Sequence, residues 1–168
     1  SLLRDLPPFV QSVGLFVNAE PAFIESVLNA VPLDLLQFHG DETAADCRHA
    51  GRPYLRAVRM AEGVDLLDSA RQFADARALL LDAHVEGYGG GGKVFDWSLV
   101  AHGLPCRVVL SGGLHAANVT DGILRLRPWA VDVSSGVESA KGIKDAALMR
   151  RFCEAVREAD ARLANLAT

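Results

Sequence analysis

The sequence predicts an α/β protein folded as a (β/α)8 barrel (TIM barrel), with about six of the eight βα units present. Short apolar runs alternate with helix-like stretches, which is the order of a parallel sheet covered by helices. Six units in 168 residues give 28 residues per unit, close to the roughly 30 of such a barrel. Polar and glycine residues follow the strands along the whole chain, and no GxGxxG motif follows the first strand. Both features favour a barrel over a doubly wound sheet.

Six strands are expected from apolar and β-branched runs bounded by turn residues. They cover residues 10–17, 33–38, 54–60, 79–81, 107–110 and 130–133. Helices are expected at 21–31, 43–49, 64–73, 98–101 and 117–126, and a last helix is expected to begin after the cap residue Asp145. Residues 1–8 resemble the last turns of a helix that stops at two prolines.

Helical spacing predicts which residues of these helices are buried. The expected buried faces are Phe23, Val27 and Ala30 in the first helix, Val64, Leu67, Ala70 and Phe73 in the third, and Leu148, Phe152, Val156, Ala159 and Leu163 in the last.

Composition and charge limit the classes of function. Half of the residues are apolar and 23% are charged, which is typical of one globular domain. The net charge of −4 predicts no general affinity for nucleic acid or an anionic membrane, and no apolar run reaches the ~18–20 residues of a membrane span. Cys47, Cys106 and Cys153 are too far apart for a CxxC site, which indicates a reducing cytoplasm.

Asp82 is the first candidate for catalysis. It follows the apolar run 79–81 and precedes a glycine-rich loop over 87–92 that ends at Lys93. A strand fixes an acid in position, and a glycine loop can open and close over it. The alternative is an ordinary strand end that starts a helix, followed by a surface loop. Lys93 is expected to reach solvent from this loop.

The loops after the last two strands are candidates for binding a phosphate. They read Ser111-Gly112-Gly113 and Ser134-Ser135-Gly136. In a (β/α)8 barrel these loops commonly bind a phosphate, because glycine lets backbone N–H groups approach an anion and serine adds a hydroxyl donor. Plain turns are the alternative interpretation.

Two further polar residues lie at or near strand ends. Asp132 is expected to point into the barrel and to bind a ligand hydroxyl, since a buried aspartate is costly unless it is paired. His39 could equally contact a ligand or act as a structural partner of Asp41. Arg59 is expected to be a surface or ion-pair residue, and the three cysteines are expected to be structural.

Four segments together resemble the phosphoribosylanthranilate isomerase family, which catalyses the third step of tryptophan synthesis from chorismate. They are LDLLQFHGDE (33–42), LLLDAHVEGYGGGGKVFDW (79–97), VVLSGGL (108–114) and AVDVSSGVESAKGIKD (130–145). The segments occur in the family's order and span nearly the whole chain, so the combination is far more specific than any single motif.

The resemblance implies an Amadori rearrangement of N-(5′-phosphoribosyl)anthranilate, with no cofactor and no metal. A general acid protonates the ribose ring oxygen, the ring opens to a Schiff base, and a general base removes the proton at C2′. The acid maps onto Asp82, whose carboxyl group must stay partly protonated through desolvation. The phosphate maps onto Gly112, Gly113, Ser134, Ser135 and Gly136, and the ribose and anthranilate lie near Asp132 and His39. The expected partner is this small phosphosugar, bound by a monomer or homodimer in the cytoplasm.

The sequence also departs from the family pattern. The family's base is a cysteine in a KxCG motif on the first strand, and an arginine after the second strand helps to hold the anthranilate. Neither feature is found here. Family loops usually carry Ser or Thr where Gly91 stands. The helix after 107–110 opens LHAAN instead of Thr-Pro, which predicts a weaker N-cap.

Six strands cannot close an eight-stranded barrel without leaving two unpaired edges. We therefore expect residues 1–168 to form one N-terminally incomplete domain, whose missing two βα units, about 50 residues, belong to a longer protein or to another chain. The chain alone is then expected to be inactive. The alternative function is a non-catalytic or complementation-dependent phosphosugar-binding fragment. An enzyme like indole-glycerol-phosphate synthase is a weaker alternative, because its catalytic lysines at strand ends are not seen here.

Overall fold

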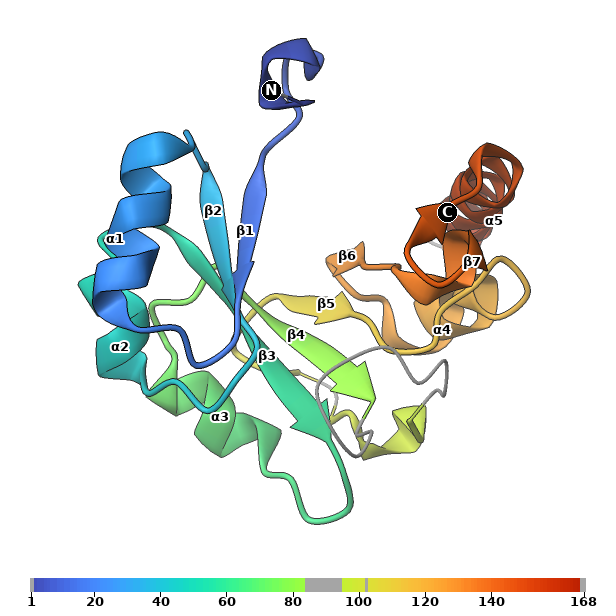
Figure 1. The fold of residues 1–168 in the computed structure, drawn as a ribbon. Helices are drawn as coiled ribbons and strands as arrows, with labels where there is room; N and C mark the ends of the chain where they lie inside the picture. Colours follow the sequence, from blue (N-terminus) through green and yellow to red (C-terminus); the bar gives the residue numbers. More distant parts are fainter. Residues whose placement is uncertain (1, 84–94, 102, 167–168) are drawn as a thin grey trace.

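The computed structural model describes residues 2–83, 95–101 and 103–166. Its main sheet contains β1 (Val13–Phe16), β2 (Leu35–Phe38), β3 (Tyr54–Met60), β4 (Ala78–Ala83), β5 (Val108–Leu110) and β6 (Ala130–Val131). Each strand pairs in parallel with the next one in the sequence. The strand order never reverses, so the doubly wound alternative is wrong and the sheet is part of a barrel. The sheet curls so that β1 and β6 form its two ends (Figure 1).

Helices cover the outside of this sheet in two groups (Figure 1). The helices α1 (Pro21–Ala30), α2 (Ala44–His49) and α3 (Leu66–Gln72) lie beside β1 to β4, whereas α4 (Val119–Leu126) and α5 (Ala146–Leu166) pack against each other near β6. Short 3-10 helices cover Leu2–Asp5, Trp97–Leu99 and Ser135–Val137. An antiparallel hairpin of β7 (Glu138–Ala140) and β8 (Ile143–Lys144) was not predicted from the sequence. Among the described helices, none is long and apolar enough to cross a membrane.

Alternation along the strands divides the core between the two faces of the sheet. On β4, Leu79 and Leu81 belong to the cluster beneath α1 to α3, which also contains Phe38. Leu80, between them, belongs instead to the cluster on the inner face with Leu55. The central strands are therefore apolar on both faces, as expected for a parallel sheet covered by helices.

The predicted buried faces of α1 and α3 are confirmed in part: Ala70 and Phe73 are buried and Val27 and Val64 pack against the core, whereas Phe23, Ala30 and Leu67 are exposed. In α1, Phe23 is 58% exposed and Ile24 is buried, and in α3, Leu67 is 43% exposed and Leu66 is buried. The third helix begins at Leu66 because the Asp65 side chain accepts hydrogen bonds from the first backbone N–H groups of the helix. Successive residues of an α-helix lie about 100° apart around its axis, so an error of one position in the predicted face moves a side chain from the core to solvent.

The prediction for the last helix is confirmed. Asp145 Oδ1 accepts hydrogen bonds from the backbone N–H groups of Ala147 and Leu148, at 2.8 and 2.9 Å. Phe152 and Ala159 are buried, and the other predicted members of the face pack against them: Leu148, Val156 and Leu163. The weaker N-cap of α4 is also confirmed, because Asn118 makes no side-chain cap hydrogen bond.

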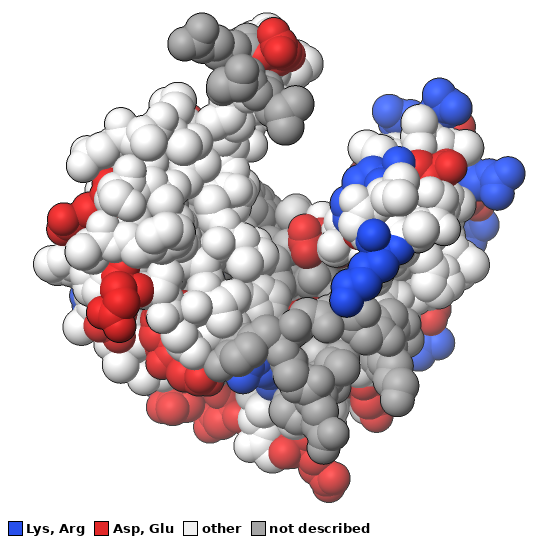
Figure 2. All heavy atoms as spheres, in the orientation of Figure 1, with Lys and Arg blue, Asp and Glu red and all other residues white. Residues whose placement is uncertain are grey.

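The two end strands leave part of the inner face uncovered. Val13 and Leu15 on β1 are 45% and 58% exposed. Within the described residues, β1 pairs only with β2 and β6 only with β5. Figure 2 shows the surface hollowed between the lobe that contains β1 and the lobe that contains α5. The sheet is therefore an open part of a ring with two unpaired edges.

Candidate active site

The C-terminal ends of the strands surround one cavity of about 260 Å³. It is lined by Leu15, Val17, Gln37, His39, Asp82, Ser111, Gly112, Gly113, Leu114, Asp132, Val133, Ser134 and Ser135. Parallel strands all end at the same face of the sheet, which brings residues far apart in the sequence together. Of the residues that the sequence indicated for catalysis and binding, Gly136 alone is not among these lining residues.

Asp82, near the end of β4, is held by two neighbours. His39 Nε2 lies 2.9 Å from Asp82 Oδ2, and the backbone N–H of Ala83 donates to Asp82 Oδ1 at 2.9 Å. The side chains of His39 and Asp82 are only 18% and 21% exposed. The pair is thus largely withdrawn from water. Electrostatic interactions are stronger in such a partly buried place than in water. Asp41, the other partner considered for His39, contacts Asn18 and Arg59.

Gln37 continues this chain of contacts, and sequence reasoning missed it. Its Nε2 lies 3.0 Å from His39 Nδ1, and the residue is only 9% exposed. Gln37 lies two residues before His39, so both side chains point to the same face of the sheet. A polar residue at this spacing inside the apolar run LDLLQF was the signal that could have found it.

Asp132 lies directly after β6 and is paired within the protein. The Ser111 hydroxyl donates to Asp132 Oδ2 at 2.8 Å, and Ser111 is itself buried. The backbone N–H of Asp132 donates to the carbonyl of Leu110 at 2.8 Å, which continues the pairing of β5 and β6. This hydrogen bonding reduces the penalty of withdrawing the carboxylate from water.

Close packing of the loops explains two of the glycines. Gly112 has a φ of +78°, and a Cβ there would overlap Ala83 N and Asp82 Oδ1. A Cβ at Gly136 would overlap the carbonyl oxygen of Leu114. The loop after β5 therefore touches the end of β4 and the loop after β6, and these positions require glycine whether or not an anion binds there.

A lysine that the sequence did not indicate lies beside the loop after β6. Lys144 Nζ donates to the carbonyl oxygen of Ser134 at 2.8 Å and to its hydroxyl oxygen at 3.3 Å. The same ammonium donates to Glu138 Oε1 at 2.7 Å. The hydrogen bond from Lys144, together with one from the backbone N–H of Gly142, lowers the pKa of Glu138. The charge of Lys144 next to the serine loop is thus partly offset.

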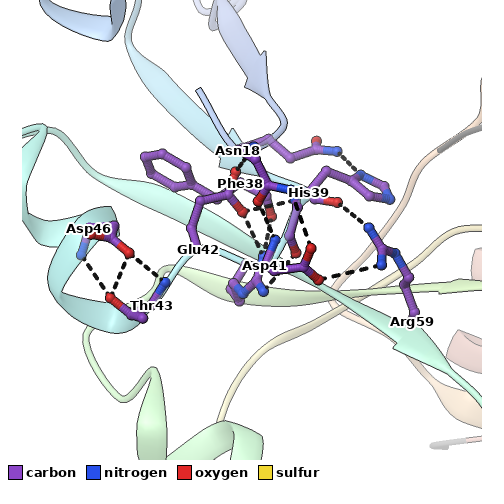
Figure 3. Close-up of polar contacts among 11 residues, drawn as sticks. Asn18, Phe38, His39, Asp41, Glu42, Thr43, Asp46 and Arg59 are labelled. Atoms are coloured by element: carbon purple, nitrogen blue, oxygen red, sulfur yellow. Dashed lines mark hydrogen bonds and ion pairs between the residues drawn. The ribbon is translucent and has the colours of Figure 1, made fainter. Parts of the chain in front are cut away.

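A buried ion pair supports the loops around His39 (Figure 3). Arg56 and Glu42 are 9% and 8% exposed, and Arg56 Nη1 lies 3.2 Å from Glu42 Oε2. Glu42 also accepts hydrogen bonds from the backbone N–H groups of Asn18 and Gly40, at 2.6 and 2.8 Å. Arg56 donates to the carbonyl oxygens of Phe38 and Gly40 at 3.1 and 2.9 Å. The pair therefore ties the loop after β1 to the loop after β2.

Other residues that the sequence singled out lie away from this cavity. Arg59 lies 3.5 Å from Asp41 and donates to the carbonyl of His39 at 3.3 Å, so the ion-pair prediction is confirmed. Cys47 is buried, Cys106 is partly buried and Cys153 is exposed. All three are free thiols outside the cavity lining, and burial raises the pKa of Cys47 to about 11.

The glycine loop over 87–92 and Lys93 lie outside the described residues. In the part of the chain that the structure does describe, no group of three or more His, Cys, Asp or Glu side chains could hold a metal ion.

Comparison with known proteins gives consistent matches over most of the chain. The profile of the family described as N-(5'phosphoribosyl)anthranilate (PRA) isomerase matches residues 3–155. A relative from Leptothrix cholodnii, named N-(5'-phosphoribosyl)anthranilate isomerase, is 71% identical over 161 residues, which are 96% of this chain and 73% of the relative.

Two solved structures support the same assignment. Phosphoribosyl anthranilate isomerase from Thermus thermophilus has a TM-score of 0.82 at 30% identity and covers 94% of this chain and 77% of its own. A phosphoribosyl anthranilate isomerase in complex with reduced 1-(o-carboxyphenylamino)-1-deoxyribulose 5-phosphate has a TM-score of 0.76 at 37% identity, over 92% of this chain and 75% of its own. The chain therefore belongs to the N-(5'-phosphoribosyl)anthranilate isomerase family.

Proposed function

We propose that this chain carries the general acid and the phosphate-binding loops of an N-(5′-phosphoribosyl)anthranilate isomerase of tryptophan biosynthesis. The reaction converts N-(5′-phosphoribosyl)anthranilate to 1-(2-carboxyphenylamino)-1-deoxyribulose 5-phosphate by an Amadori rearrangement. The observation that supports the proposal most is the cavity at the strand ends that Asp82 and His39 line together with the loops of Gly112 and Ser135. A related enzyme bound to a reduced form of this product adds support.

In the proposed mechanism Asp82 gives its proton to the ribose ring oxygen. The bond between C1′ and that oxygen breaks, and the lone pair of the anthranilate nitrogen forms the C=N bond of a Schiff base. A base then removes the proton at C2′, and the electrons of that C–H bond give the enolamine. The C2′ hydroxyl loses its proton while C1′ gains one, which leaves the ketone. A positioned acid contributes typically 10²–10⁴-fold to such a step, on the order of 3–5 kcal/mol.

The proposed binding roles follow from the same geometry. Gly112, Gly113, Ser134 and Ser135, which line the cavity, hold the 5′-phosphate through backbone N–H groups and hydroxyls. Gly136 does not line the cavity, and its role in phosphate binding rests on the family resemblance. Asp132 accepts a hydrogen bond from a ribose hydroxyl, in exchange for or beside its bond from Ser111, and His39 lies next to the reacting end of the sugar. Fixing the phosphate at one end of the cavity orients the other end of the substrate toward Asp82.

We propose that further βα units close the ring between β6 and β1 and supply the base. The unpaired edges of these strands and the exposed Val13 and Leu15 support this part of the proposal. None of the three cysteines lines the cavity, so the cysteine base of the family pattern has no counterpart in the described site. The six units alone are then inactive, and they work by complementation.

The acid is tested by Asp82→Asn in the complete enzyme. We expect turnover to fall by at least ~100-fold, because asparagine cannot give up a proton, while a 5-phosphorylated product analogue still binds. Asp160→Asn, on the exposed face of α5, is the matched control and should leave turnover unchanged. Near-normal turnover of Asp82→Asn would exclude Asp82 as the acid.

Ring closure is tested by complementation. The purified 168-residue chain should show no isomerase turnover, and adding the N-terminal βα segment of the Leptothrix cholodnii relative should restore it. Turnover by the chain alone at the rate of the complete enzyme would place the base within these residues. Sedimentation of the reconstituted enzyme distinguishes the two oligomeric states we propose, a monomer or a homodimer. The free thiols of Cys47, Cys106 and Cys153 support the cytoplasm as its location, since thiols persist there.

A further inference from the structure

The Gln37 side chain contacts the His39 ring. It is only 9% exposed, and it lines the same cavity as His39 and Asp82. The structure sets Gln37 Nε2 against His39 Nδ1 at 3.0 Å and His39 Nε2 against Asp82 Oδ2 at 2.9 Å. The three side chains form one line of contacts from β2 to β4.

The first of these contacts determines where the ring carries its proton. With the amide oriented as in the structure, its nitrogen donates and cannot accept, so His39 Nδ1 is the acceptor and carries no proton. The single proton of a neutral imidazole is then on Nε2, where it points at Asp82 Oδ2. Asp82 Oδ1 is occupied separately by the N–H of Ala83.

We propose that Gln37 is a positioning residue that fixes the tautomer of the His39 ring, with the ring proton on Nε2 and directed at Asp82. The consequence for catalysis rests on the proposed function, in which Asp82 is the acid. A neutral ring orients the carboxyl group without adding a positive charge beside it. An imidazolium at the same distance would hold Asp82 as a carboxylate and remove the proton that it must give.

The opposite orientation of the Gln37 amide has different consequences. Turning the amide would set Oε1 against Nδ1, and an oxygen requires a proton on Nδ1. Nε2 of a neutral ring would then be an acceptor and could face only a protonated Asp82. The two orientations therefore differ in which His39 nitrogen bears the proton, and this difference is measurable without any enzymatic assay.

The direct test is NMR of the full chain labelled with ¹⁵N, at a pH near 8. An N–H···N hydrogen bond transmits a scalar coupling between its two nitrogens, and an N–H···O bond does not. We expect a coupling between Gln37 Nε2 and His39 Nδ1, together with an Nδ1 chemical shift typical of an unprotonated ring nitrogen. Absence of the coupling, or a protonated Nδ1, would overturn the proposal. The wild-type measurement needs no variant to fold.

Two variants separate positioning from mere space filling. In Gln37→Glu the new carboxylate accepts from Nδ1, so His39 is expected to become an imidazolium under conditions that leave the wild-type ring neutral. In Gln37→Leu, which is similar in volume, no donor faces Nδ1, so the ring proton is expected to divide between Nδ1 and Nε2 and the Nδ1 chemical shift to move. A space-filling role predicts the wild-type Nδ1 chemical shift in Gln37→Leu, and that result contradicts the proposal. The resonances of His115, whose Nδ1 accepts from the N–H of Ala117 at 3.2 Å, report in the same spectra whether the fold is retained.

Kinetics of the complete isomerase connect the ring state to catalysis. Gln37→Glu should lower kcat by ~10-fold or more relative to Gln37→Leu, with little change in KM, because the acid is less available while binding is kept. Equal kcat values for the two variants would contradict the role in catalysis. If the wild-type complete enzyme showed no isomerase turnover, the proposed function would fail, and the NMR result would still decide the state of His39.

Discussion

Removing the charge of Arg56 is expected to destabilise the chain far more than removing an exposed arginine. Arg56→Met deletes the ion pair with Glu42 and the hydrogen bonds to the carbonyl oxygens of Phe38 and Gly40. Methionine still fills much of the space against the Phe73 ring, whose centroid lies 5.0 Å from the guanidinium carbon. The change therefore removes mainly charge and hydrogen bonding.

The distance between the two charges indicates how much stability the Arg56→Met variant should lose. At 3.2 Å and an effective dielectric constant near 20, the attraction between the two charges is about 5 kcal/mol. Removing one partner of a buried pair typically destabilises by ~3–5 kcal/mol, because the other charge stays buried and uncompensated. Glu42 keeps the N–H donors of Asn18 and Gly40, so we expect the lower end, about 3 kcal/mol. This is a large part of the ~5–15 kcal/mol that stabilises a domain.

Urea unfolding followed by circular dichroism measures this change. Arg125→Met is the matched control, because Arg125 pairs with Asp121 across one turn of α4 with side chains 66% and 54% exposed, and we expect a loss below ~0.5 kcal/mol. The double variant with Glu42→Gln should lose at least ~1 kcal/mol less than the sum of its single variants, since no buried charge remains unpaired. Equal urea midpoints for Arg56→Met and Arg125→Met would refute the reasoning.

Three further predictions concern packing, thiol reactivity and pH. Gly112→Ala should destabilise by at least ~1 kcal/mol more than Gly51→Ala in urea unfolding, because both positions have a positive φ but only at Gly112 would a Cβ overlap other atoms. Cys153 should react with a thiol reagent under native conditions long before Cys47, which is buried and whose pKa is raised to about 11, and equal rates would contradict this burial. Hydrogen bonds from Ser12 lower the pKa of Asp34 below 3.8 in the folded chain, so its contribution to stability is present above that value and is lost as the pH falls. The stability difference between the wild type and Asp34→Asn, measured by unfolding, should therefore shrink toward acid pH. A difference that grows toward acid pH would show that folding raises the pKa of Asp34 instead of lowering it.

Much of the fold was predictable because strands and turns leave local signals. The strand Tyr54–Met60 has the predicted bounds, since an apolar, β-branched run lies between clear turn residues. The buried faces of short helices are less certain, because Phe23 and Ile24 are both apolar and only the sheet beneath decides which one is buried. The hairpin of β7 and β8 has strands of three and two residues, too short for a periodic signal.

The site was predictable in its location but not in its pairings. Polar residues at the ends of parallel strands must gather at one face, so the meeting of Asp82, Asp132 and Gly112 follows from the topology. The contact between His39 and Asp82 joins residues 43 positions apart, and no local pattern indicates it. No local pattern in the strand indicates that Arg56 carries a buried charge. Its partner Glu42 is identified only once β2 and β3 are known to be adjacent.

The packing of Gly112 also changes how the phosphate hypothesis must be tested. A Cβ at this position would overlap Asp82 Oδ1 as well as Ala83 N, so any larger residue disturbs the proposed acid directly. Lost activity in Gly112→Ala would therefore not show that the loop binds phosphate. Ser135→Ala removes one hydroxyl in a loop that lines the same cavity and leaves Gly112 in place. A rise in KM at constant kcat in that variant would identify ground-state binding by the loop, whereas an unchanged KM would leave the Ser134 hydroxyl and the backbone N–H groups as the phosphate donors.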